Sequence, residues 1–381
     1  MKYCKRCLMP DTRPRITFNE EGFCNACEYG DKKKQIDWKE RRRELEVLLE
    51  SCKTKNGYWD CIVPWSSGKD SSAIAHRLKF EFGMHPLLVT VAPQVQTEEG
   101  KHNQMALLEL GFDHLLFTLN PRVHKRLSRK HFIQYGDPWM GWSQAVNSIP
   151  VKAAVDFNIP NIFYAEHGET EYGGKVLSKK HQKERDLTEV REIMIGHDPK
   201  EWVDEGISLK DIAAYMYPEK KDIERVGVTA HYFGYYHKWN SIDNYFYAKK
   251  HWDFMTVQEG HTDFDLPGVP KKGRTEGTFT NYDSIDDKLD NIYYFLQYIK
   301  FGFGRAVRDA SRLIQNGVIT REEGLKLALK YDGEFPSRTF KDFLEWTDIE
   351  ETEFWDIVDS FRNPDIWKKI NGEWRLRYAL A

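Results

Sequence analysis

The sequence lacks the segments that would carry it into or across a membrane. No run of about eighteen apolar residues occurs in the 381 residues, so we expect no transmembrane helix and no membrane partner. The N-terminal stretch MKYCKRCLMPDTRP lacks the apolar core of a signal peptide, which favours a cytoplasmic protein. An excess of basic charge is missing as well, because the net charge is −3. We therefore expect no nucleic acid as partner, although net charge does not test for a local basic patch.

Cysteine is scarce, and four of the six cysteines lie near the N-terminus. Cys4 and Cys7 form one Cys-x2-Cys pair, and sixteen residues separate it from the pair Cys24 and Cys27. Two such pairs supply the four thiolates of a tetrahedral Zn²⁺ site. Because four protein ligands leave no open position for a substrate, we predict a structural zinc, with an iron–sulfur cluster as the alternative.

The middle of the chain alternates between two kinds of segment, after a charged, helix-like stretch at 32–49. Apolar segments typical of strands lie at 59–64, 86–91, 114–119 and 161–165. Segments with helical character lie at 71–82, 98–110 and 151–157. This alternation predicts an α/β fold with a Rossmann-like parallel sheet covered on both faces.

The last third of the chain has a helical pattern, and Thr320 with Glu323 indicates a capping box at the start of one helix. We expect three parts: a four-cysteine module at 1–40, an α/β domain at 41–255 and a mainly helical region at 256–381.

A polar loop follows the first predicted strand. It comprises Ser66, Ser67, Gly68, Lys69, Asp70, Ser71 and Ser72. Small residues allow backbone N–H groups to approach a pyrophosphate, and the N-terminus of the following helix adds partial positive charge. Lys69 could add a full charge, and Asp70 could hold Mg²⁺ against the phosphates. The alternative is a cluster of serines that only caps a helix. The loop is not a Walker A motif, since GxxxxGK[ST] does not occur.

An acidic loop follows the fourth predicted strand and contains Glu166, Glu169 and Glu171. Ligands of open parallel sheets bind beyond the carboxyl ends of the strands, so this loop should share an edge with the polar loop. We predict catalytic roles for Lys69, Asp70, Glu169 and Glu171, with the glutamates sharing Mg²⁺ or orienting an amine. The alternative is a solvated acidic turn.

The polar loop resembles the PP-loop, SGGxDS, of GMP synthetase, NAD synthetase, asparagine synthetase and tRNA thiolases. Ser67 stands where the first glycine of that motif is found. The resemblance implies that the loop binds the β,γ-pyrophosphate of ATP, so that a substrate oxygen attacks the α-phosphate. It also implies that adenine lies near the end of the second strand, at Val89, Thr90 and Val91.

Several segments together resemble a narrower family, the N-acetyl sugar amidotransferases of bacterial surface-polysaccharide and nonulosonate biosynthesis. They are CKRCLMPDTRP, CNAC, SSGKDSS, GETEYGG, GYYHKWNS, RTEGTFTNYDSIDDKLD, KFGFGRAVRDAS and ITREEGLKLALKYDGEFP. The resemblance implies that ATP adenylylates the acetamido oxygen of a nucleotide-linked sugar and that ammonia then replaces it, giving an acetamidino group for lipopolysaccharide O-antigen. It also implies a partner glutaminase subunit, similar to that of histidine biosynthesis, because this chain shows no glutaminase signature of its own.

The third part of the chain supplies the predicted sugar-nucleotide pocket. The candidates are polar residues near glycines or helix starts: Arg274, Thr275, Glu276, Asp287, Lys288, Lys300 and Arg305. Arg305, Arg308 and Arg312 recur at i, i+3 and i+7, so one helix face carries three guanidinium groups that suit phosphate. A solvated basic face is the alternative for Arg308 and Arg312.

Two other functions compete with this one. The first is a PP-loop tRNA thiolase, but sulfur transfer usually needs a reactive cysteine near the nucleotide, and only Cys52 and Cys61 lie outside the two pairs. The second is a catalytically inactive scaffold that recruits the glutaminase, which the retention of Lys69 and Asp70 disfavours.

Overall fold

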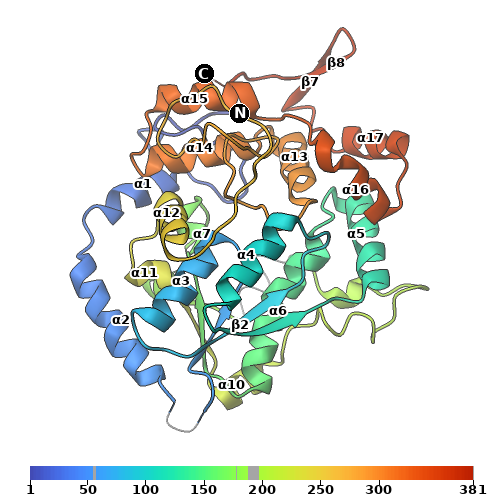
Figure 1. Cartoon of the computed structure of the whole chain (residues 1–381). Coiled ribbons are helices and arrows are strands. Elements are labelled where there is room, and N and C mark those ends of the chain that lie inside the picture. Colours follow the sequence, from blue (N-terminus) through green and yellow to red (C-terminus); the bar gives the residue numbers. More distant parts are fainter. Residues whose placement is uncertain (55–56, 177, 188–196, 381) are drawn as a thin grey trace.

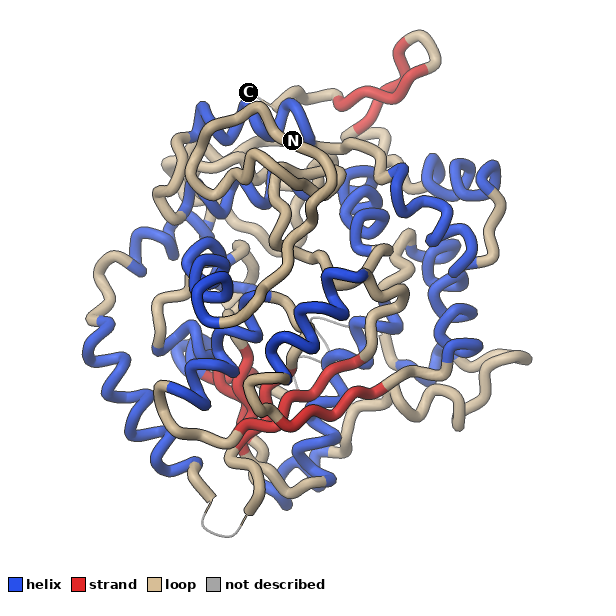
Figure 2. Tube along the Cα trace, in the orientation of Figure 1, coloured by secondary structure: helices blue, strands red, loops and turns tan. Residues whose placement is uncertain are grey.

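The apolar segments of the middle part form one central sheet. A computed structural model describes residues 1–54, 57–176, 178–187 and 197–380. In the sheet the strand order is β3-β2-β1-β4-β6-β5, and every pairing is parallel except that of β5 with β6. The strands are β1 Cys61–Pro64, β2 Pro86–Val91, β3 Asp113–Phe117, β4 Asn161–Tyr164, β5 Glu184–Arg185 and β6 Thr229–Tyr232. Figure 2 shows these strands as one twisted layer surrounded by helices.

Side chains of β1 alternate between two hydrophobic cores, as the period of a strand requires. Cys61 and Val63 pack into the core on one face, and Ile62 packs into the core on the other. The strand is buried on both faces, which is why its sequence is continuously apolar rather than alternating. Ile62 pairs with Leu87 on one side and with Ile162 on the other, so β1 lies inside the sheet.

Helices cover both faces of this sheet (Figure 1). The core on the Val63 face includes residues of α2 Trp38–Cys52, α3 Lys69–Phe80, α4 Glu98–Leu108 and α12 Ser241–His251. The core on the Ile62 face includes residues of α5 Pro121–Tyr135 and α6 Met140–Asp156. Shorter helical segments complete this part: α7 Gly168–Glu171, α8 Lys179–Lys183, η1 Pro199–Trp202, α10 Lys220–Val226 and α11 Phe233–Tyr236. The α/β class and the parallel sheet are confirmed.

The last third of the described chain is helical, as expected. It comprises α13 Asp290–Phe301, α14 Arg305–Gln315, α15 Arg321–Tyr331, α16 Ser337–Thr347, α17 Glu351–Ser360 and the hairpin strands β7 Trp367–Ile370 and β8 Glu373–Leu376. Thr320 and Glu323 form the expected capping box at the start of α15. No helix in the described ranges combines the length and the apolarity that crossing a bilayer requires.

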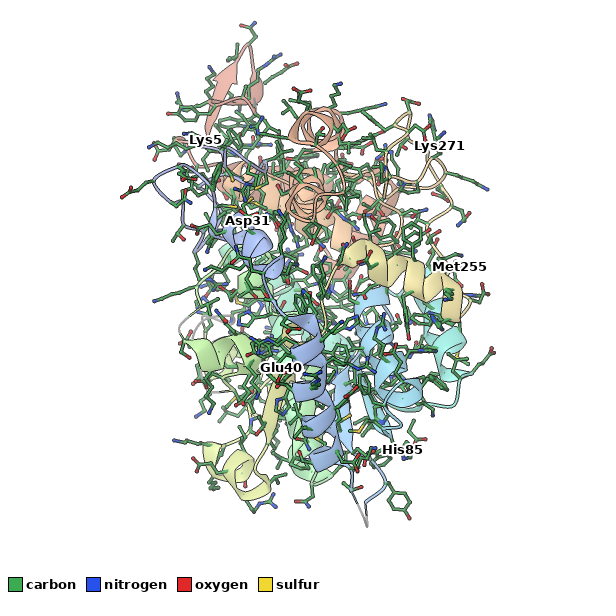
Figure 3. The ribbon with its side chains drawn as sticks, turned by 90° about the vertical axis from the view of Figure 1, so that its left-hand side faces the viewer. Lys5, Asp31, Glu40, His85, Met255 and Lys271 are labelled. Atoms are coloured by element: carbon green, nitrogen blue, oxygen red, sulfur yellow. The ribbon has the colours of Figure 1, made fainter. Side chains whose placement is uncertain are left out.

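The N-terminal module packs against this helical region. The four cysteines share a hydrophobic core with residues of α14 and α15, and the backbone N–H of Leu8 donates to Ser311 Oγ at 3.2 Å. Figure 3 shows Lys5 and Asp31 beside the C-terminal helices and Glu40 further along, on the helix that runs down the side of the sheet. The predicted boundaries between the three parts stay predictions, but the first and third parts have one core in common.

The charged stretch at 32–49 is two helices rather than one. α1 Asn25–Lys33 ends inside this stretch, at Lys33, and α2 begins at Trp38. Asp37 accepts hydrogen bonds from the backbone N–H groups of Lys39 at 2.9 Å and Glu40 at 3.1 Å. This N-cap starts a new helix where the charge pattern alone indicated a continuous one.

Candidate active site

A cavity of about 460 Å³ opens where the central parallel strands end. Its walls come from the loop after β1, the ends of β2 and β4, one side of α6, the segment around Asp283 and the start of α14. The sequence-predicted ATP residues that line it are Ser66, Gly68, Lys69, Asp70, Ser71, Val89, Thr90 and Val91. Ser67 and Ser72 are buried in the loop and do not line the cavity.

The loop after β1 turns sharply at Ser67, whose φ of 65° lies in the left-handed region. Glycine adopts this conformation without strain, whereas a serine pays about 1 kcal/mol or more. The backbone N–H of Gly68 donates to Ser66 Oγ at 3.3 Å, and that of Ser66 to Ser71 Oγ at 3.4 Å. These bonds hold the loop so that the N-terminus of α3, with its unpaired N–H groups, faces the cavity.

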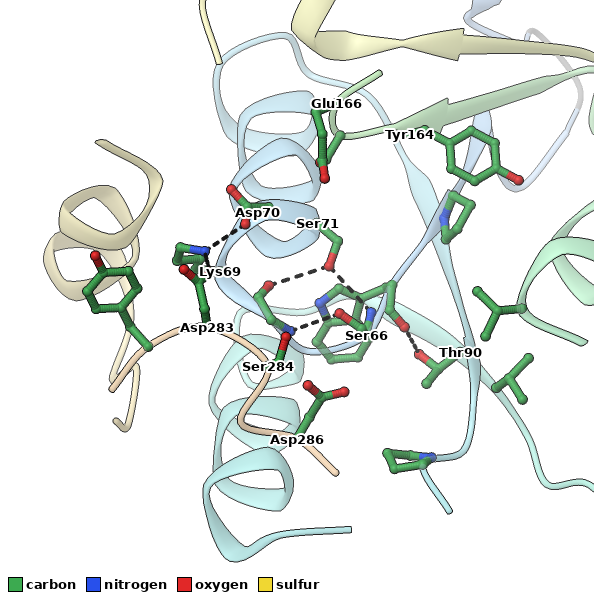
Figure 4. Close-up of a pocket in the computed structure, with 18 of the residues that line it drawn as sticks. Ser66, Lys69, Asp70, Ser71, Thr90, Tyr164, Glu166, Asp283, Ser284 and Asp286 are labelled. Carbon is green, nitrogen blue, oxygen red and sulfur yellow. Dashed lines mark hydrogen bonds and ion pairs between the residues drawn. The ribbon is translucent and has the colours of Figure 1, made fainter. Parts of the chain in front are cut away.

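Lys69 lies in a buried ion-paired cluster beside the loop. Its Nζ is 2.7 Å from Asp70 Oδ2 and also contacts Asp283. Burial alone would lower the pKa of Lys69, but the two carboxylates outweigh it and raise the pKa. The lysine is therefore charged, and the carboxylates of Asp70 and Asp283 balance its charge. Figure 4 shows Lys69, Asp70 and Asp283 together on one side of the cavity.

Asp70 is fixed by donors from far along the sequence. Its Oδ1 accepts from Trp239 Nε1 at 3.1 Å and from Asn244 Nδ2 at 2.7 Å. Asp283 is held by Lys69, which keeps the pKa of this buried aspartate low despite its burial. The two carboxylates on either side of Lys69 offer oxygen atoms of the kind that Mg²⁺ prefers.

The opposite side of the cavity is apolar. Val91, Trp142, Val146, Pro150 and Tyr164 line it. Thr90 Oγ1 donates to the carbonyl of Trp65 at 2.5 Å, which ties the end of β2 to the polar loop. An apolar surface next to the polar loop suits a purine ring. Tyr164 marks this side in Figure 4.

The acidic loop after β4 sends only one of its three glutamates into the cavity. Glu166 lines it and accepts a hydrogen bond from Tyr172 Oη at 2.7 Å. Desolvation and the nearby charge of Asp70 raise the pKa of Glu166 to about 7. A carboxyl that titrates near neutral pH beside the polar loop is suited to general acid–base catalysis.

Glu169 and Glu171 lie outside the cavity, contrary to the expectation that they face the polar loop. Glu169 Oε1 pairs with Arg15 at 2.6 Å, and Glu171 Oε2 pairs with Lys33 at 2.8 Å. Both partners belong to the N-terminal module, so these glutamates fasten that module to the sheet edge. Sequence spacing placed three carboxylates in one loop but did not tell which one faces the ligand.

Three arginines of α14 line the same cavity. Arg305 donates to Asn291 Oδ1 at 3.1 Å, and its Nε is 3.8 Å from Asp309. Arg312 pairs with Asp309 at 3.2 Å. Arg308 contacts the ring of Tyr294 at 4.8 Å and Gln297 Oε1 at 3.5 Å. The expected arginine face is therefore directed at the cavity rather than at bulk solvent.

Most of the other predicted sugar-nucleotide residues lie elsewhere. Thr275, Asp287 and Lys288 line a separate cavity of about 330 Å³ beside α16. Lys300 lines a third cavity, and its Nζ donates to the carbonyl of Tyr135 at 2.8 Å.

Two more of these residues form structural contacts. Arg274 makes a bidentate ion pair with Glu334, at 2.6 and 2.7 Å. Glu276 accepts from Ser337 Oγ at 2.8 Å and from the backbone N–H of Arg338 at 3.1 Å. Both side chains are engaged by residues of α16 or the segment before it, and of the seven candidates only Arg305 lines the main cavity.

The four cysteines converge as the spacing predicts. Their sulfur atoms all lie within 4.8 Å of one another and are buried. Cys4 and Cys27 sulfurs are 3.8 Å apart, and those of Cys7 and Cys24 are 3.6 Å apart. A tetrahedral zinc with Zn–S bonds of about 2.3 Å requires sulfur–sulfur distances of about 3.8 Å. The cluster therefore fits one closed metal site.

The sequence contained weak signals for the residues that it did not assign. Asp283, Trp239 and Asn244 have no motif of their own, and only folding brings them to Lys69 and Asp70. Asp283 and Trp239 do fall inside two of the segments that carried the family resemblance. The aromatic Trp142 and Tyr164 gave no signal, because aromatic residues are abundant throughout this chain.

Comparison with known proteins supports the resemblance. Residues 276–380 match the family described as "LPS biosynthesis protein WbpG-like, C-terminal domain". An uncharacterized protein from Methanocaldococcus jannaschii is 28% identical over 120 residues, which cover 29% of this chain and 43% of that protein. The structure of NMN synthetase from Francisella tularensis covers 53% of this chain and 94% of its own, with 14% identity and a TM-score of 0.28.

The match at 276–380 links the last part of the chain to lipopolysaccharide biosynthesis, as the resemblance implied. The resemblance inferred from the sequence is confirmed at this level. The chain spans less than half of the curated relative that it matches.

Proposed function

We propose that this chain is an ATP-dependent amidotransferase of lipopolysaccharide biosynthesis. It adenylylates the acetamido oxygen of a nucleotide-linked sugar and replaces that oxygen with ammonia, forming an acetamidino group. The observation that carries the proposal is a single cavity that joins the phosphate loop, a near-neutral glutamate and the arginine face of α14. The match of residues 276–380 to a lipopolysaccharide-biosynthesis domain supports the substrate class.

The cavity divides naturally among the parts of the reactants. Its apolar side at Val91 and Trp142 suits adenine, and the N-terminus of α3 suits the β- and γ-phosphates. The side chains of Arg305 and Arg308 then face the remaining space, where an anionic sugar nucleotide would enter. Asp70 and Asp283 would hold Mg²⁺, which supplies positive charge to the departing pyrophosphate.

The reaction begins with attack of the amide oxygen on the α-phosphate. The bond between the α- and β-phosphates breaks, pyrophosphate leaves, and the amide becomes an O-adenylyl imidate. Ammonia adds to the imidate carbon, and AMP departs with the former amide oxygen. Glu166 takes the proton that ammonia loses, because its pKa of about 7 leaves much of it deprotonated near neutral pH.

Two further components belong to the proposal. A glutaminase subunit supplies the ammonia, since the reaction needs an amine donor and the sequence shows no glutaminase signature. The four cysteines bind a structural Zn²⁺, for which the convergence of the four sulfur atoms is the support. The thiolase alternative is disfavoured by the position of Cys52 and Cys61, which are buried in the core and do not line the main cavity.

Isotopic labelling tests the chemistry directly. The enzyme is incubated with ATP, ammonium and a sugar nucleotide whose acetamido carbonyl carries heavy oxygen. We expect labelled AMP, unlabelled pyrophosphate and a sugar product about one dalton lighter than the unlabelled sugar nucleotide. Formation of ADP and phosphate would show attack at the γ-phosphate and overturn the adenylylation step. Labelled AMP without an amidine would refute ammonia as the nucleophile that attacks the imidate. Sulfur incorporation into tRNA would support the thiolase.

A further inference from the structure

The third cavity, which Lys300 lines, adjoins the main one, and most of its charged side chains are basic. It has a volume of about 300 Å³, and Arg308 lines both cavities. Arg13, Arg15, Lys300 and Arg308 contribute four basic side chains to it, whereas Asp137 is its one acidic side chain. Asp137 accepts the backbone N–H of Trp139 at 3.0 Å, and burial raises the pKa of this carboxyl. The cavity therefore has an excess of positive charge.

Lys300 is bonded to a backbone carbonyl, and the two arginines Arg13 and Arg308 lack a carboxylate partner in the described part of the chain. Arg15 pairs with Glu169, but within the described ranges no carboxylate lies within 4.0 Å of Arg13 or Arg308. Arg13 donates through Nη1 alone, to the carbonyls of Pro14 at 3.2 Å and Gly173. Among the residues that the structure describes, the other side-chain N–H groups of Arg13 have no acceptor. Arg308 has a long contact to Gln297 Oε1 at 3.5 Å and a contact with the ring of Tyr294 at 4.8 Å, and neither partner carries a negative charge.

The two guanidinium groups oppose each other electrostatically. Burial, and next the charge of Arg308, lower the pKa of Arg13 to about 10. Holding like charges together without a counter-ion costs free energy, and an anion between them would recover it. Forked guanidinium donors match phosphate oxygens in particular.

We infer that Arg13 and Arg308 form a binding site for the diphosphate of a nucleoside diphosphate in this third cavity. The inference rests on the proposed function for the identity of the full substrate, a sugar attached to that diphosphate. Because Arg308 lines both cavities, the sugar can extend into the main cavity while the phosphates stay between the arginines. Tyr293 and Phe301 line the same cavity and offer aromatic surface to the nucleoside.

The site gives the N-terminal module a role in substrate binding. Arg13 lies between the two cysteine pairs in the sequence, and its loop is held against the acidic loop by the contact with Gly173. Asn25, next to Cys24, donates to the carbonyl of Gly174 at 2.7 Å. The four-cysteine cluster thus positions an arginine that faces the ligand, in addition to stabilising the fold.

Calorimetric titration with UDP tests the site on the full-length protein. The phosphate loop is first saturated with α,β-methylene ATP, so that UDP cannot bind there. We expect UDP to bind the loaded protein, and Arg13→Gln and Arg308→Gln each to weaken this binding about 10- to 100-fold. Arg375→Gln, in the β7–β8 hairpin and outside these cavities, is the matched control and should change nothing. UMP should bind more weakly than UDP, because one phosphate cannot engage both arginines.

Two results would overturn the inference: UDP binding that is unchanged in both variants, or UDP that competes with the ATP analogue. Melting curves identify a variant that fails to fold, and because the arginines come from different elements, either one alone tests the site. Arg13→Lys adds a test that keeps the charge and removes the fork, and it too should weaken UDP binding.

Kinetics separate this site from the proposed reaction. In Arg13→Gln the KM for the sugar nucleotide should rise while the KM for ATP stays the same. Arginine-dependent UDP binding by an enzyme that forms no amidine would support the site and refute the proposed function. Amidine formation with a KM for the sugar nucleotide that neither variant changes would refute the site alone.

Discussion

The phosphate loop and the acidic loop lie on the same edge of the sheet, yet their side chains are positioned by different means. The backbone of the phosphate loop is held by bonds within seven consecutive residues, such as Gly68 to Ser66 and Ser66 to Ser71. Its Asp70 side chain accepts from distant residues as well. The acidic loop is held by the N-terminal module, whose Arg15 and Lys33 form ion pairs with Glu169 and Glu171, respectively. A loop whose backbone is held by local contacts can be recognised from the sequence. The roles of side chains that are held by distant residues cannot be recognised in this way.

The largest effect should come from the phosphate loop. Asp70→Asn keeps the size of the side chain and the oxygen that accepts from Trp239 and Asn244, but it removes the charge and the second acceptor oxygen beside Lys69. We expect AMP formation to fall by about 1,000-fold or more, because the carboxylate acts on the departing pyrophosphate through the metal. Steady-state release of pyrophosphate measures it. Asp113→Asn, at an exposed position of β3, is the control, and an Asp70→Asn enzyme with near-normal turnover would remove Asp70 from the site.

The remote module should show its effect first in stability. Cys24→Ser removes one of the four converging sulfurs, and we expect a loss of at least about 3 kcal/mol in the free energy of unfolding. Urea denaturation measures it, and metal analysis should find one zinc per wild-type chain. Cys52→Ser, a buried cysteine outside the cluster, should cost clearly less. Equal losses in the two variants, or a stable protein without metal, would contradict the zinc site.

The two kinds of glutamate in the acidic loop can be compared directly. Glu166→Gln should reduce amidine formation about 100-fold by removing the proton acceptor, whereas Glu169→Gln should change it by less than about tenfold. In the wild type, activity should rise with pH through about 7 as Glu166 deprotonates, and this limb should vanish in Glu166→Gln. A pH–rate profile at saturating ammonia measures it, and a larger loss in Glu169→Gln would reverse the assignment.

The raised pKa of Glu166 has a second consequence, for stability. Folding raises this pKa from 4.5 to about 7, so the folded state binds the proton more tightly than the unfolded chain. The stabilisation from this proton is present below pH 4.5 and is lost as the pH rises towards 7. Glu166→Gln should therefore show a flatter decline in stability between pH 4.5 and 7 than the wild type, measured by thermal melting across that range.

The smallest effect should come from the strained turn. Ser67→Gly relieves the positive φ and should raise stability by up to about 1 kcal/mol. Ser66→Gly is the matched comparison, because it removes the oxygen that accepts from Gly68 and adds backbone entropy to the unfolded state, and it should destabilise the protein. Differential scanning calorimetry compares the two, and changes of the same sign would show that the turn at Ser67 is not strained.

Sequence spacing by itself determined the features whose partners are near in the chain. The alternation of apolar strands and helices predicted the parallel sheet, and the polar loop after Cys61–Pro64 predicted a phosphate site at its edge. The paired cysteines predicted a closed metal cluster, since the two turns need only come together once. The periodicity of Arg305, Arg308 and Arg312 predicted one arginine face, because the geometry of a helix fixes which side chains lie together.

Only the tertiary structure decided which charged groups face one another. Asp283 reaches Lys69 from more than two hundred positions away, and Glu166 is separated from Glu169 and Glu171 by the partners that the N-terminal module supplies. Arg13 faces a cavity because its module packs on α14. Interactions between distant segments depend on how whole elements pack, and periodicity and spacing carry no record of that packing.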